Sequence, residues 1–511
     1  MINKTSFTFI TFIVTFIALL VCSSDVRSDE PWEHIHKSLA VDGEPSNHFG
    51  SSVAISGDLA IVGVPDDDEY GPHSGSVYLF EVSTGRQIFK LNVTDQSAYD
   101  YFGSAVAIDG SIAVIGAPFH RNRKNSTGAA YVIDLITSRL ISILRPAGGN
   151  DNGGFGGSVA IHGNRALIGA PDQNNEGIES GAVYIFNINT GKQLHRLHAP
   201  DGSDGDSFGT AVAFNGKIAI IGADNDDTIN GPSSGSAYLF NVSTGRFISL
   251  LVPEDGEPRD QFGFAVDVSA NLAIIGARFD DDNGTGSGSA YVFDITTGRQ
   301  ITKLLATDGR AGDSFGISVA IHGNHALVGA TGTDDKGYLS GSAYIFETTT
   351  GRQLQKLLAP DGTASDRFGL SVALGRNSAI IGATGDTNEN GQSSGSAYFF
   401  RNQTSDYLLS VTPDPLIAGQ EGIFTISKTF PYEKTWLIYS RIGLQQNFIR
   451  KLNIVIDLAN PKLVARPKFT DEVGDLQFVV KMPRKRKWRN IWFQAVQREN
   501  VTNYIATQIE P

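Results

Sequence analysis

The dipeptide Phe-Gly recurs along this chain at an almost constant spacing. Successive copies are 53 residues apart, except for one interval of 54 residues. The seven phenylalanines are Phe49, Phe102, Phe155, Phe208, Phe262, Phe315 and Phe368. A fixed period of this length indicates a repeat architecture, in which each copy is one small unit that buries its apolar face against its neighbours. The fold therefore has to be built from seven similar units.

Each copy contains four short segments of strand character. In the sixth copy these are SVAIHG, HALVGA, GSAYIF and QLQKLLA. Alternating Val, Ile, Leu, Tyr and Phe bounded by Gly and Asp favours strands, and the 3.6-residue period of a helix is missing. Four short strands repeated seven times are typical of a β-propeller. We therefore predict an all-β fold, a seven-bladed propeller of four-stranded blades.

The two ends of the repeat region complement each other. Residues 34–43, HIHKSLAVDG, align with residues 353–362, QLQKLLAPDG, which form the fourth strand of a unit. The seventh copy reaches GSAYFF and then lacks this fourth segment. An N-terminal strand that completes the last blade would leave no open sheet edge. The sequence predicts a closed ring over residues 31–404.

The repeated motifs FGxSVA, IGA or GAP, and SGSAYLF resemble FG-GAP repeats, which build the head propeller of integrin α subunits and occur in many secreted bacterial proteins. The resemblance covers the whole of residues 31–404 and implies the propeller fold, although a fold by itself does not fix a function. Integrin-type propellers carry calcium loops directly after the SVA segment. Here that connection is a tight turn, so the resemblance transfers no calcium residue to this chain.

Two connections in each unit are long and acidic. They are the segment before each Phe-Gly and the loop after IGA, for example PDDDEYG, DNDDTING and DDDNGTG. Successive strands of a meander run antiparallel, so both connections should lie on the same rim of the ring. We expect that rim to be negative. Residues that recur in every copy, such as the tyrosine of the third strand, are instead expected to serve the scaffold.

Carboxylate clusters in these loops offer the oxygen ligands that Ca²⁺ prefers. Asp and Asn also gather in turns because their side chains cap backbone amides, so turn formation is the competing explanation. The fold requires no cofactor, and calcium is the cation that the loops suggest. The candidate calcium ligands are Asp66, Asp68, Asp224, Asp226, Asp280 and Asp282.

The second copy departs from the acidic pattern. Its loop, PFHRNRKNSTG, places His120, Arg121, Arg123 and Lys124 where other copies carry carboxylates. These residues could form a local binding site for a carboxylate or sulfate of a partner. A salt-bridged patch or a tolerated variation is the plainer explanation, because exposed charges contribute little to stability.

Residues 1–28 have the pattern of a signal peptide. Lys4 precedes an apolar run from Phe7 to Val21, which is short for a membrane span, and small polar residues follow it. We expect the protein to be secreted, periplasmic or displayed at the cell surface. Leu19-Leu20-Val21-Cys22 also resembles a bacterial lipobox, so membrane attachment is expected only if Cys22 is lipidated.

The repeat ends before residue 405. Residues 405–511 contain six or seven strand-like segments, which predict a small β-sandwich domain. This region has 15 Lys and Arg against 10 Asp and Glu. Its basic segment PRKRKWR includes Arg484, Lys485, Arg486 and Lys487 as candidate contacts to an anionic partner, with a solvated loop as the default. Nucleic-acid binding is not expected, given export and the acidic propeller.

Three functional classes follow from these features. The leading hypothesis is a non-catalytic, exported recognition or adhesion protein that binds an extracellular protein or glycan through the acidic rim loops, where binding sites tend to lie. An alternative is a hydrolase or lyase with its site in the central funnel, but we find no nucleophile motif, metal-spaced histidines or copy-specific carboxylate pair. A structural component of the cell envelope is the third class. The oligomeric state is not encoded in any motif.

Overall fold

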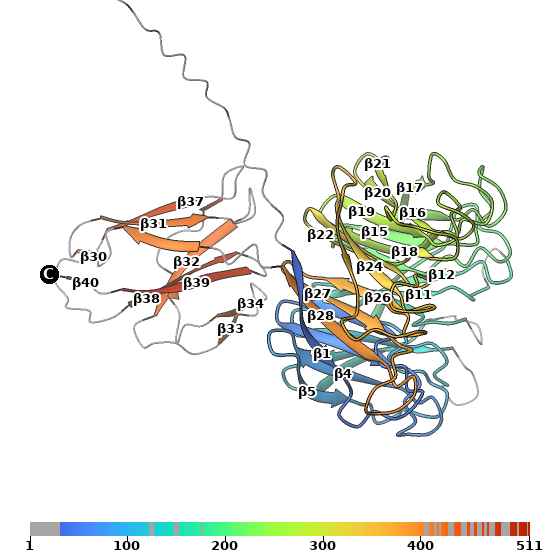
Figure 1. Cartoon of the computed structure of the whole chain (residues 1–511), viewed down its shortest axis with the longest axis horizontal. Coiled ribbons are helices and arrows are strands. Elements are labelled where there is room, and N and C mark those ends of the chain that lie inside the picture. Colours follow the sequence, from blue (N-terminus) through green and yellow to red (C-terminus); the bar gives the residue numbers. More distant parts are fainter. Residues whose placement is uncertain are drawn as a thin grey trace, which may run out of the picture.

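The protein is described by a computed structural model that covers residues 31–121, 127–147, 153–174 and 177–402, together with the backbone of strands within residues 408–510. The described residues between 31 and 402 form four-stranded antiparallel sheets arranged as the blades of a ring (Figure 1). Inner strands of neighbouring blades contact one another around the whole ring, including those of the last and first blades. The predicted all-β, seven-bladed propeller is confirmed.

The strands of each blade follow one another from the axis outward. Blades 1 to 3 consist of β2 (Ser52–Ser56), β3 (Leu59–Val64), β4 (Ser76–Glu81) and β5 (Arg86–Leu91); β6 (Val106–Asp109), β7 (Ile112–Ala117), β8 (Ala129–Asp134) and β9 (Arg139–Leu144); and β10 (Ser158–His162), β11 (Arg165–Ala170), β12 (Ala182–Asn187) and β13 (Lys192–Leu197). Blades 4 and 5 consist of β14 (Val212–Phe214), β15 (Ile218–Ala223), β16 (Ser236–Asn241) and β17 (Arg246–Leu251); and β18 (Phe262–Ser269), β19 (Leu272–Ala277), β20 (Ser289–Asp294) and β21 (Arg299–Leu304). Blades 6 and 7 consist of β22 (Phe315–His322), β23 (His325–Ala330), β24 (Ser342–Glu347) and β25 (Gln353–Leu357); and β26 (Phe368–Leu374), β27 (Ser378–Ala383), β28 (Ser396–Asn402) and the N-terminal β1 (Trp32–Ser38).

The N-terminal strand closes the ring. β1 pairs antiparallel with β28, so that the outer strand of blade 7 comes from the opposite end of the repeat region. Trp32 is buried at the start of β1, and its backbone exchanges two hydrogen bonds with the side-chain amide of Gln355 in blade 6. The closure predicted from the two chain ends is therefore confirmed.

Strands also form in the C-terminal region. They are β29 (Leu408–Thr412), β30 (Leu416–Ile417), β31 (Glu421–Ser427), β32 (Lys434–Ser440), β33 (Asn447–Ile449), β34 (Ile454–Ile456), β35 (Lys462–Leu463), β36 (Lys468–Phe469), β37 (Leu476–Lys481), β38 (Ile491–Gln497), β39 (Asn500–Thr507) and β40 (Ile509–Glu510). β31 pairs with β29 and β37, and β38 pairs with β32 and β39. The sandwich arrangement stays a prediction. The signal-peptide segment, residues 1–28, lies outside the described residues.

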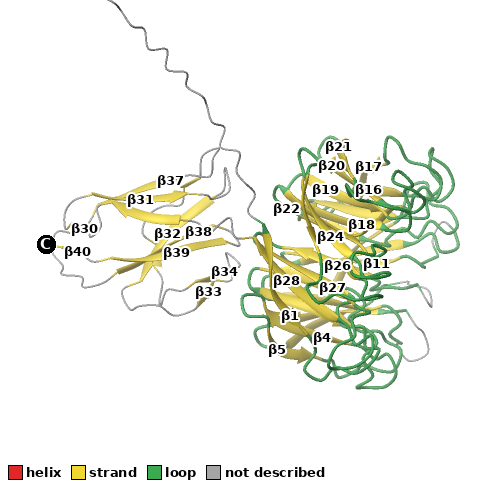
Figure 2. Cartoon of the chain, in the orientation of Figure 1, coloured by secondary structure: helices red, strands yellow, loops and turns green. Residues whose placement is uncertain are grey.

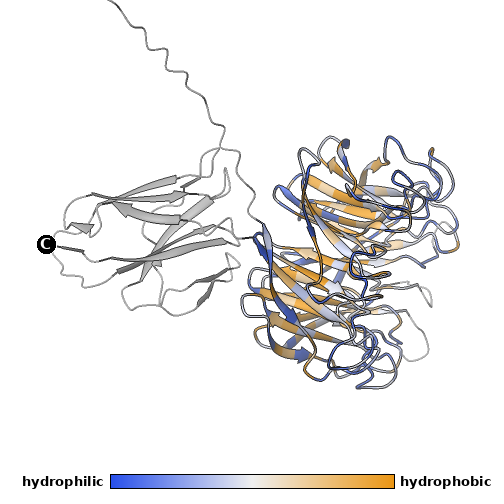
Figure 3. Ribbon diagram, in the orientation of Figure 1, coloured by the Kyte–Doolittle hydropathy of each residue, from blue (hydrophilic) through white to orange (hydrophobic). Residues whose placement is uncertain are grey.

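The apolar core lies between the blades rather than within each one. One cluster joins Ile61 and Val77 of blade 1 to Phe102 and Ile115 of blade 2, and similar clusters span the other neighbouring pairs. In Figure 3 the apolar residues, in orange, lie mostly along the strands, and the loops are mostly blue. Each blade therefore buries its apolar faces only against its neighbours, which explains why the repeat has to close on itself.

The Phe-Gly dipeptide is the joint between blades. The backbone of Phe102 bridges to Gly75 of the preceding blade, while its ring packs edge-on against Tyr131 of its own blade, with the centroids 5.4 Å apart. Gly103 has φ +95°, and a Cβ there would lie 2.6 Å from the carbonyl oxygen of Ser76. The recurring glycine is thus required both by the backbone conformation and by a close backbone approach.

Substituting this glycine should destabilise the joint between blades 1 and 2. We expect Gly103→Ala to lower the free energy of unfolding by more than about 2 kcal/mol, because strain at positive φ adds to a backbone clash. Gly57→Ala is the matched control, since Gly57 has φ +60° but no atom within 4 Å of the added Cβ. Chemical denaturation of the two variants measures the difference. Equal losses would show that the close approach contributes nothing.

Candidate binding surface

The two long connections of each blade lie together on one side of the ring. Tyr99, before the second Phe-Gly, donates its backbone N–H to the carbonyl oxygen of Pro72 at 2.7 Å, and Tyr101 donates to His73 at 3.0 Å. Equivalent bonds recur around the ring, and Figure 2 shows the long loops gathered at the side of the propeller on the right of the view. We call this surface the loop rim. Among the described residues it comprises residues 39–51, 65–75, 92–105, 118–121, 127–128, 145–147, 153–157, 171–174, 177–181, 198–211, 224–235, 252–261, 278–288, 305–314, 331–341, 358–367 and 384–395.

A lysine of the outer strand neutralises the loop-rim carboxylates of blade 1. The Lys90 ammonium lies 2.8 Å from Asp42 and 2.9 Å from Asp67. It also contacts Glu69 at 2.8 Å and lies 5.2 Å from the ring centroid of Tyr78. The Tyr78 hydroxyl donates to Asp42 at 2.8 Å. Carboxylates from two different loops are therefore held together by one cation and one phenol.

The same cluster recurs in three more blades. Its lysines are Lys303 in blade 5, Lys356 in blade 6 and Lys37, contributed by β1, in blade 7. Each ammonium lies 5.1 or 5.2 Å from the ring centroid of its tyrosine. Much of the acidity visible in the loop sequences is thus offset within the scaffold, and the recurring tyrosines serve the scaffold role expected of them.

The candidate calcium ligands of blade 5 are part of such a cluster. Asp280 contacts Lys303 at 2.9 Å and Asp282 contacts it at 2.6 Å. In blade 1, Asp66 contacts Nδ1 of His48 at 2.7 Å and Nδ1 of His73 at 2.9 Å. Burial alone would raise the pKa of Asp66, but its hydrogen bonds to the two histidines hold that pKa below its usual value.

The other three candidate ligands have different surroundings. Asp68 accepts the backbone N–H of His73 at 2.7 Å, which is a turn-capping contact. Asp226 accepts the Tyr238 hydroxyl at 2.7 Å, and burial raises the pKa of the neighbouring Asp224. Among the described residues, no three His, Cys, Asp or Glu side chains are grouped so that they could hold a metal ion. Calcium binding by the six aspartates stays a prediction.

The histidine of the basic loop in blade 2 is buried in the protein rather than exposed on the rim. His120 is buried, with Nδ1 2.9 Å from Asp100 and Nε2 3.2 Å from Arg145. A guanidinium can only donate, so Nε2 accepts and the Nδ1 hydrogen points to Asp100. Arg121 is exposed at the surface. Arg123 and Lys124 lie outside the described residues, as do Arg484, Lys485, Arg486 and Lys487. Anion binding by these groups stays a prediction.

Large apolar side chains are exposed on the loop rim. Sequence reasoning did not predict this exposure. Blades 1 to 6 each place one in the loop between the second and third strands, with exposed fractions from 41% to 92%. They are Tyr70, Phe119, Ile178, Ile229, Phe279 and Tyr338. A comparison of the loops would have shown that six of them carry a large apolar residue, at three different positions within the loop. Arg278 adds a stacked cation, 3.6 Å from the ring centroid of Phe264 and 4.6 Å from that of Phe279.

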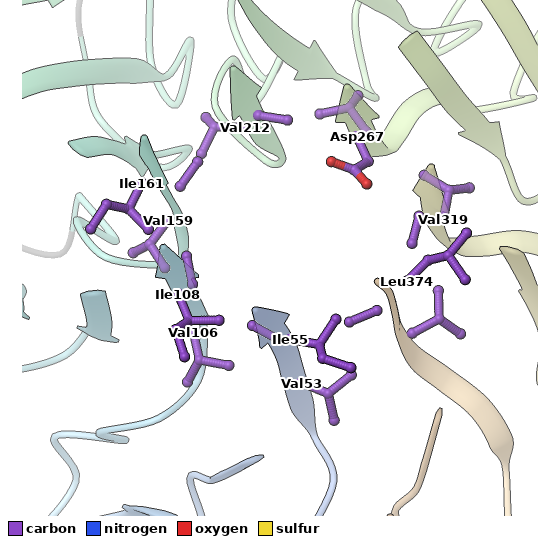
Figure 4. Close-up of a pocket in the computed structure, with 18 of the residues that line it drawn as sticks. Val53, Ile55, Val106, Ile108, Val159, Ile161, Val212, Asp267, Val319 and Leu374 are labelled. Atoms are coloured by element: carbon purple, nitrogen blue, oxygen red, sulfur yellow. The ribbon is translucent and has the colours of Figure 1, made fainter. Parts of the chain in front are cut away.

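A channel of about 350 Å³ runs through the centre of the ring and is lined by the inner strands (Figure 4). Valine, isoleucine and leucine side chains dominate it. Asp267 occupies a position where the other six blades have alanine. It accepts backbone N–H groups of Val268 at 2.7 Å and Ile321 at 2.8 Å, and burial raises its pKa to about 6. Aligning the seven copies would have exposed this departure.

The fold and the loop rim define a class of protein: a rigid propeller that presents long loops and exposed apolar side chains on one face, as recognition scaffolds do. The described residues contain no helix long and apolar enough to cross a membrane. The profile of the FG-GAP repeat matches residues 32–80, 86–133, 140–186, 192–240, 247–293, 299–346 and 352–400. The chain belongs to the FG-GAP repeat family.

A curated relative supports the resemblance to integrins. The chain is 30% identical to integrin alpha-11 of Homo sapiens over 131 residues. This match spans 22% of the chain and 11% of the length of that integrin. The similarity therefore concerns part of the chain and leaves most of the integrin without a counterpart.

Proposed function

We propose that this chain is a non-catalytic, exported recognition or adhesion protein that binds an extracellular protein or glycan through its loop rim. The observation that carries the proposal is the recurrence of one exposed, large apolar side chain on that rim in each of six consecutive blades. Singly scattered surface apolar residues need no explanation, but a repeated set on one rim is typical of an interaction surface. Export, with a secreted, periplasmic or cell-surface location, is part of the same proposal.

The chemistry of the rim supports a partner with both apolar and cationic groups. Beside the apolar residues lie exposed aspartates that each cap a backbone N–H of their own loop, namely Asp68, Asp227, Asp281 and Asp334. Aromatic side chains are frequent energetic centres of interfaces because they bury a large area with few rotatable bonds. A capped loop also loses little entropy on binding, which favours affinity.

The central channel gives only limited support to the alternative that the protein is an enzyme. Asp267 is the titratable side chain among the residues that line the described channel, and both of its oxygens accept backbone N–H groups. General acid–base or nucleophilic chemistry requires a second group within reach. A hydrolase or lyase therefore remains the second candidate, and a structural envelope role remains the third.

Screening the full-length protein against a glycan array and an extracellular protein library tests the proposal. The double variant Ile229→Ser, Tyr338→Ser should weaken the best ligand at least about 30-fold, since losing interface anchors costs 2 kcal/mol or more. Ile136→Ser is the matched control, because Ile136 is 54% exposed but lies in a turn on the opposite side of the ring. Equal loss in the control, or turnover of a glycan, would contradict the proposal.

A further inference from the structure

The outer strand of blade 4 exposes apolar side chains on an open sheet edge. β17 is the last strand in its sheet and has no strand partner on its outer side within the described part of the chain. Phe247, Ile248 and Leu250 are between 38% and 46% exposed. An open edge with apolar side chains is a ready template for another strand, and proteins usually protect such edges with charged residues, lysine above all.

The other blades show how this edge is normally protected. In blade order, the outer-strand residues directly opposite the recurring tyrosine are Lys90, Ile143, Arg196, Leu250, Lys303, Lys356 and Lys37. In blade 2, Arg145 substitutes for the missing lysine and contacts Asp95 at 3.3 Å. Blade 3 places Arg196 over the ring of Tyr184. Blade 4 has Leu250 at this position.

Blade 4 keeps the anionic half of the cluster without its cation. The Tyr238 hydroxyl is 2.9 Å from Asp201 and 2.7 Å from Asp226, and Tyr78 contacts the equivalent pair, Asp42 and Asp67, in blade 1. Asp201 is exposed and Asp226 is buried. Within the described residues neither aspartate forms an ion pair, whereas the equivalent carboxylates of blades 1, 5 and 7 contact a lysine at 2.6 to 2.9 Å.

We propose that the outer edge of β17 is a docking site for an extended, basic segment of a partner protein, which adds a strand to blade 4. Its apolar side chains cover those of β17, and a lysine or arginine reaches Asp201 and Asp226 beside Tyr238. Charge complementarity selects this partner, because the same two carboxylate positions hold an ammonium group in blades 1, 5 and 7. Main-chain hydrogen bonds supply affinity in such strand addition, and side-chain pockets supply specificity.

The docking site differs from the exposed apolar side chains of the loop rim. Its partner strand pairs with β17 at the perimeter of the ring, and only its cation reaches two rim residues, Asp201 and Asp226. β17 lies at the perimeter of the ring as the outer strand of blade 4. Phe247 packs on the face of the blade, with its ring centroid 5.7 Å from that of Phe240. The proposed function uses the ends of the loops instead. The Ile229→Ser, Tyr338→Ser variant should consequently retain full binding of a basic strand, so that the two proposals can fail independently.

Calorimetric titration of the full-length protein with an end-blocked pentapeptide of alternating valine and lysine tests the docking site. We expect sub-millimolar binding, weakened at least about tenfold in Leu250→Lys, because the new ammonium occupies the position of the partner's cation. Leu250→Lys should melt at or above the wild-type temperature, since it reproduces the cluster of the other blades. Asp201→Asn, at an exposed position, should also weaken the peptide several-fold.

Ile301→Lys is the matched control, because Ile301 is 41% exposed on the outer strand of blade 5. It should bind the peptide like the wild type. Three results would each overturn the proposal. The wild type could fail to bind at millimolar peptide, Leu250→Lys could bind the peptide as well as the wild type, or a valine–glutamate peptide could bind equally well. A concentration-dependent dimer that Leu250→Lys dissociates would also overturn it, since the occupant would then be a second copy of this chain.

Discussion

Deletion of residues 31–38 is expected to destroy the stability of the whole propeller. The deletion removes β1, which leaves β28 as an exposed apolar edge and opens the interface between blades 6 and 7. Trp32, with 4% of its surface exposed, is lost from that interface, and a buried tryptophan alone contributes about 3–5 kcal/mol. The deletion also removes Lys37 from Asp361 and Asp386, so a buried carboxylate is left without its cation.

Together these losses should exceed about 5 kcal/mol, which is a large share of the stability of a typical folded domain. Thermal unfolding followed by circular dichroism should show a broad transition at a much lower temperature, and limited proteolysis should cut within blade 7. Glu33→Ala is the control within the same strand, because Glu33 is exposed. A deletion variant that unfolds within about 1 kcal/mol of the wild type would show that β1 does not lock the ring.

Lys303→Met is expected to cause the next largest loss of stability. Lys303 joins three carboxylates from two loops, Asp255 at 2.8 Å, Asp280 at 2.9 Å and Asp282 at 2.6 Å. Methionine keeps much of the side-chain volume but leaves the buried Asp280 without a cation. Removing one partner from a buried ion pair costs roughly 3–5 kcal/mol, and we expect about 2–3 kcal/mol here because Asp255 and Asp282 are half-exposed.

The pH dependence distinguishes the ion-pair contribution from packing. Burial alone lowers the pKa of Lys303, but its hydrogen bonds to Asp255, Asp282 and Asp280 outweigh burial and raise it. The contribution is then fully present below the unfolded-state pKa of about 10.4 and declines as the pH rises toward the folded-state value. The difference in unfolding free energy between wild type and Lys303→Met should consequently shrink above about pH 10.

Arg299→Met serves as the control, because Arg299 is an exposed cation on the same strand. It should change the unfolding free energy by less than about 0.5 kcal/mol. Denaturant titrations at neutral pH and above pH 10 provide the comparison. A loss in Lys303→Met that stays constant across this range would assign the effect to packing instead of charge.

The repeating framework follows from the amino-acid sequence alone. Short runs of apolar residues bounded by Gly and Asp mark the strands, and the period of about 53 residues counts the blades. Both are local or translational patterns that need no coordinates. Even the ring closure could be predicted, because the missing fourth segment of the seventh copy has its counterpart before the first. The recurring tyrosines were likewise correctly assigned to the scaffold.

Which charged side chains remain available for binding depends on the three-dimensional fold. Lys303 and Asp255 are 48 residues apart, and nothing in either local segment indicates that they meet. Their contact depends on the register of β21 against β20 and on the path of the loop before blade 5. The loop sequences therefore suggest more surface charge than the structure leaves uncompensated. Sequence reasoning also did not predict that Asp201 and Asp226 form no ion pair within the described residues, or that Asp267 lines the channel. The repeated sequence determines the structural features that all blades share. A binding site is instead expected where one blade has a different residue and no neighbouring side chain restores the missing contact.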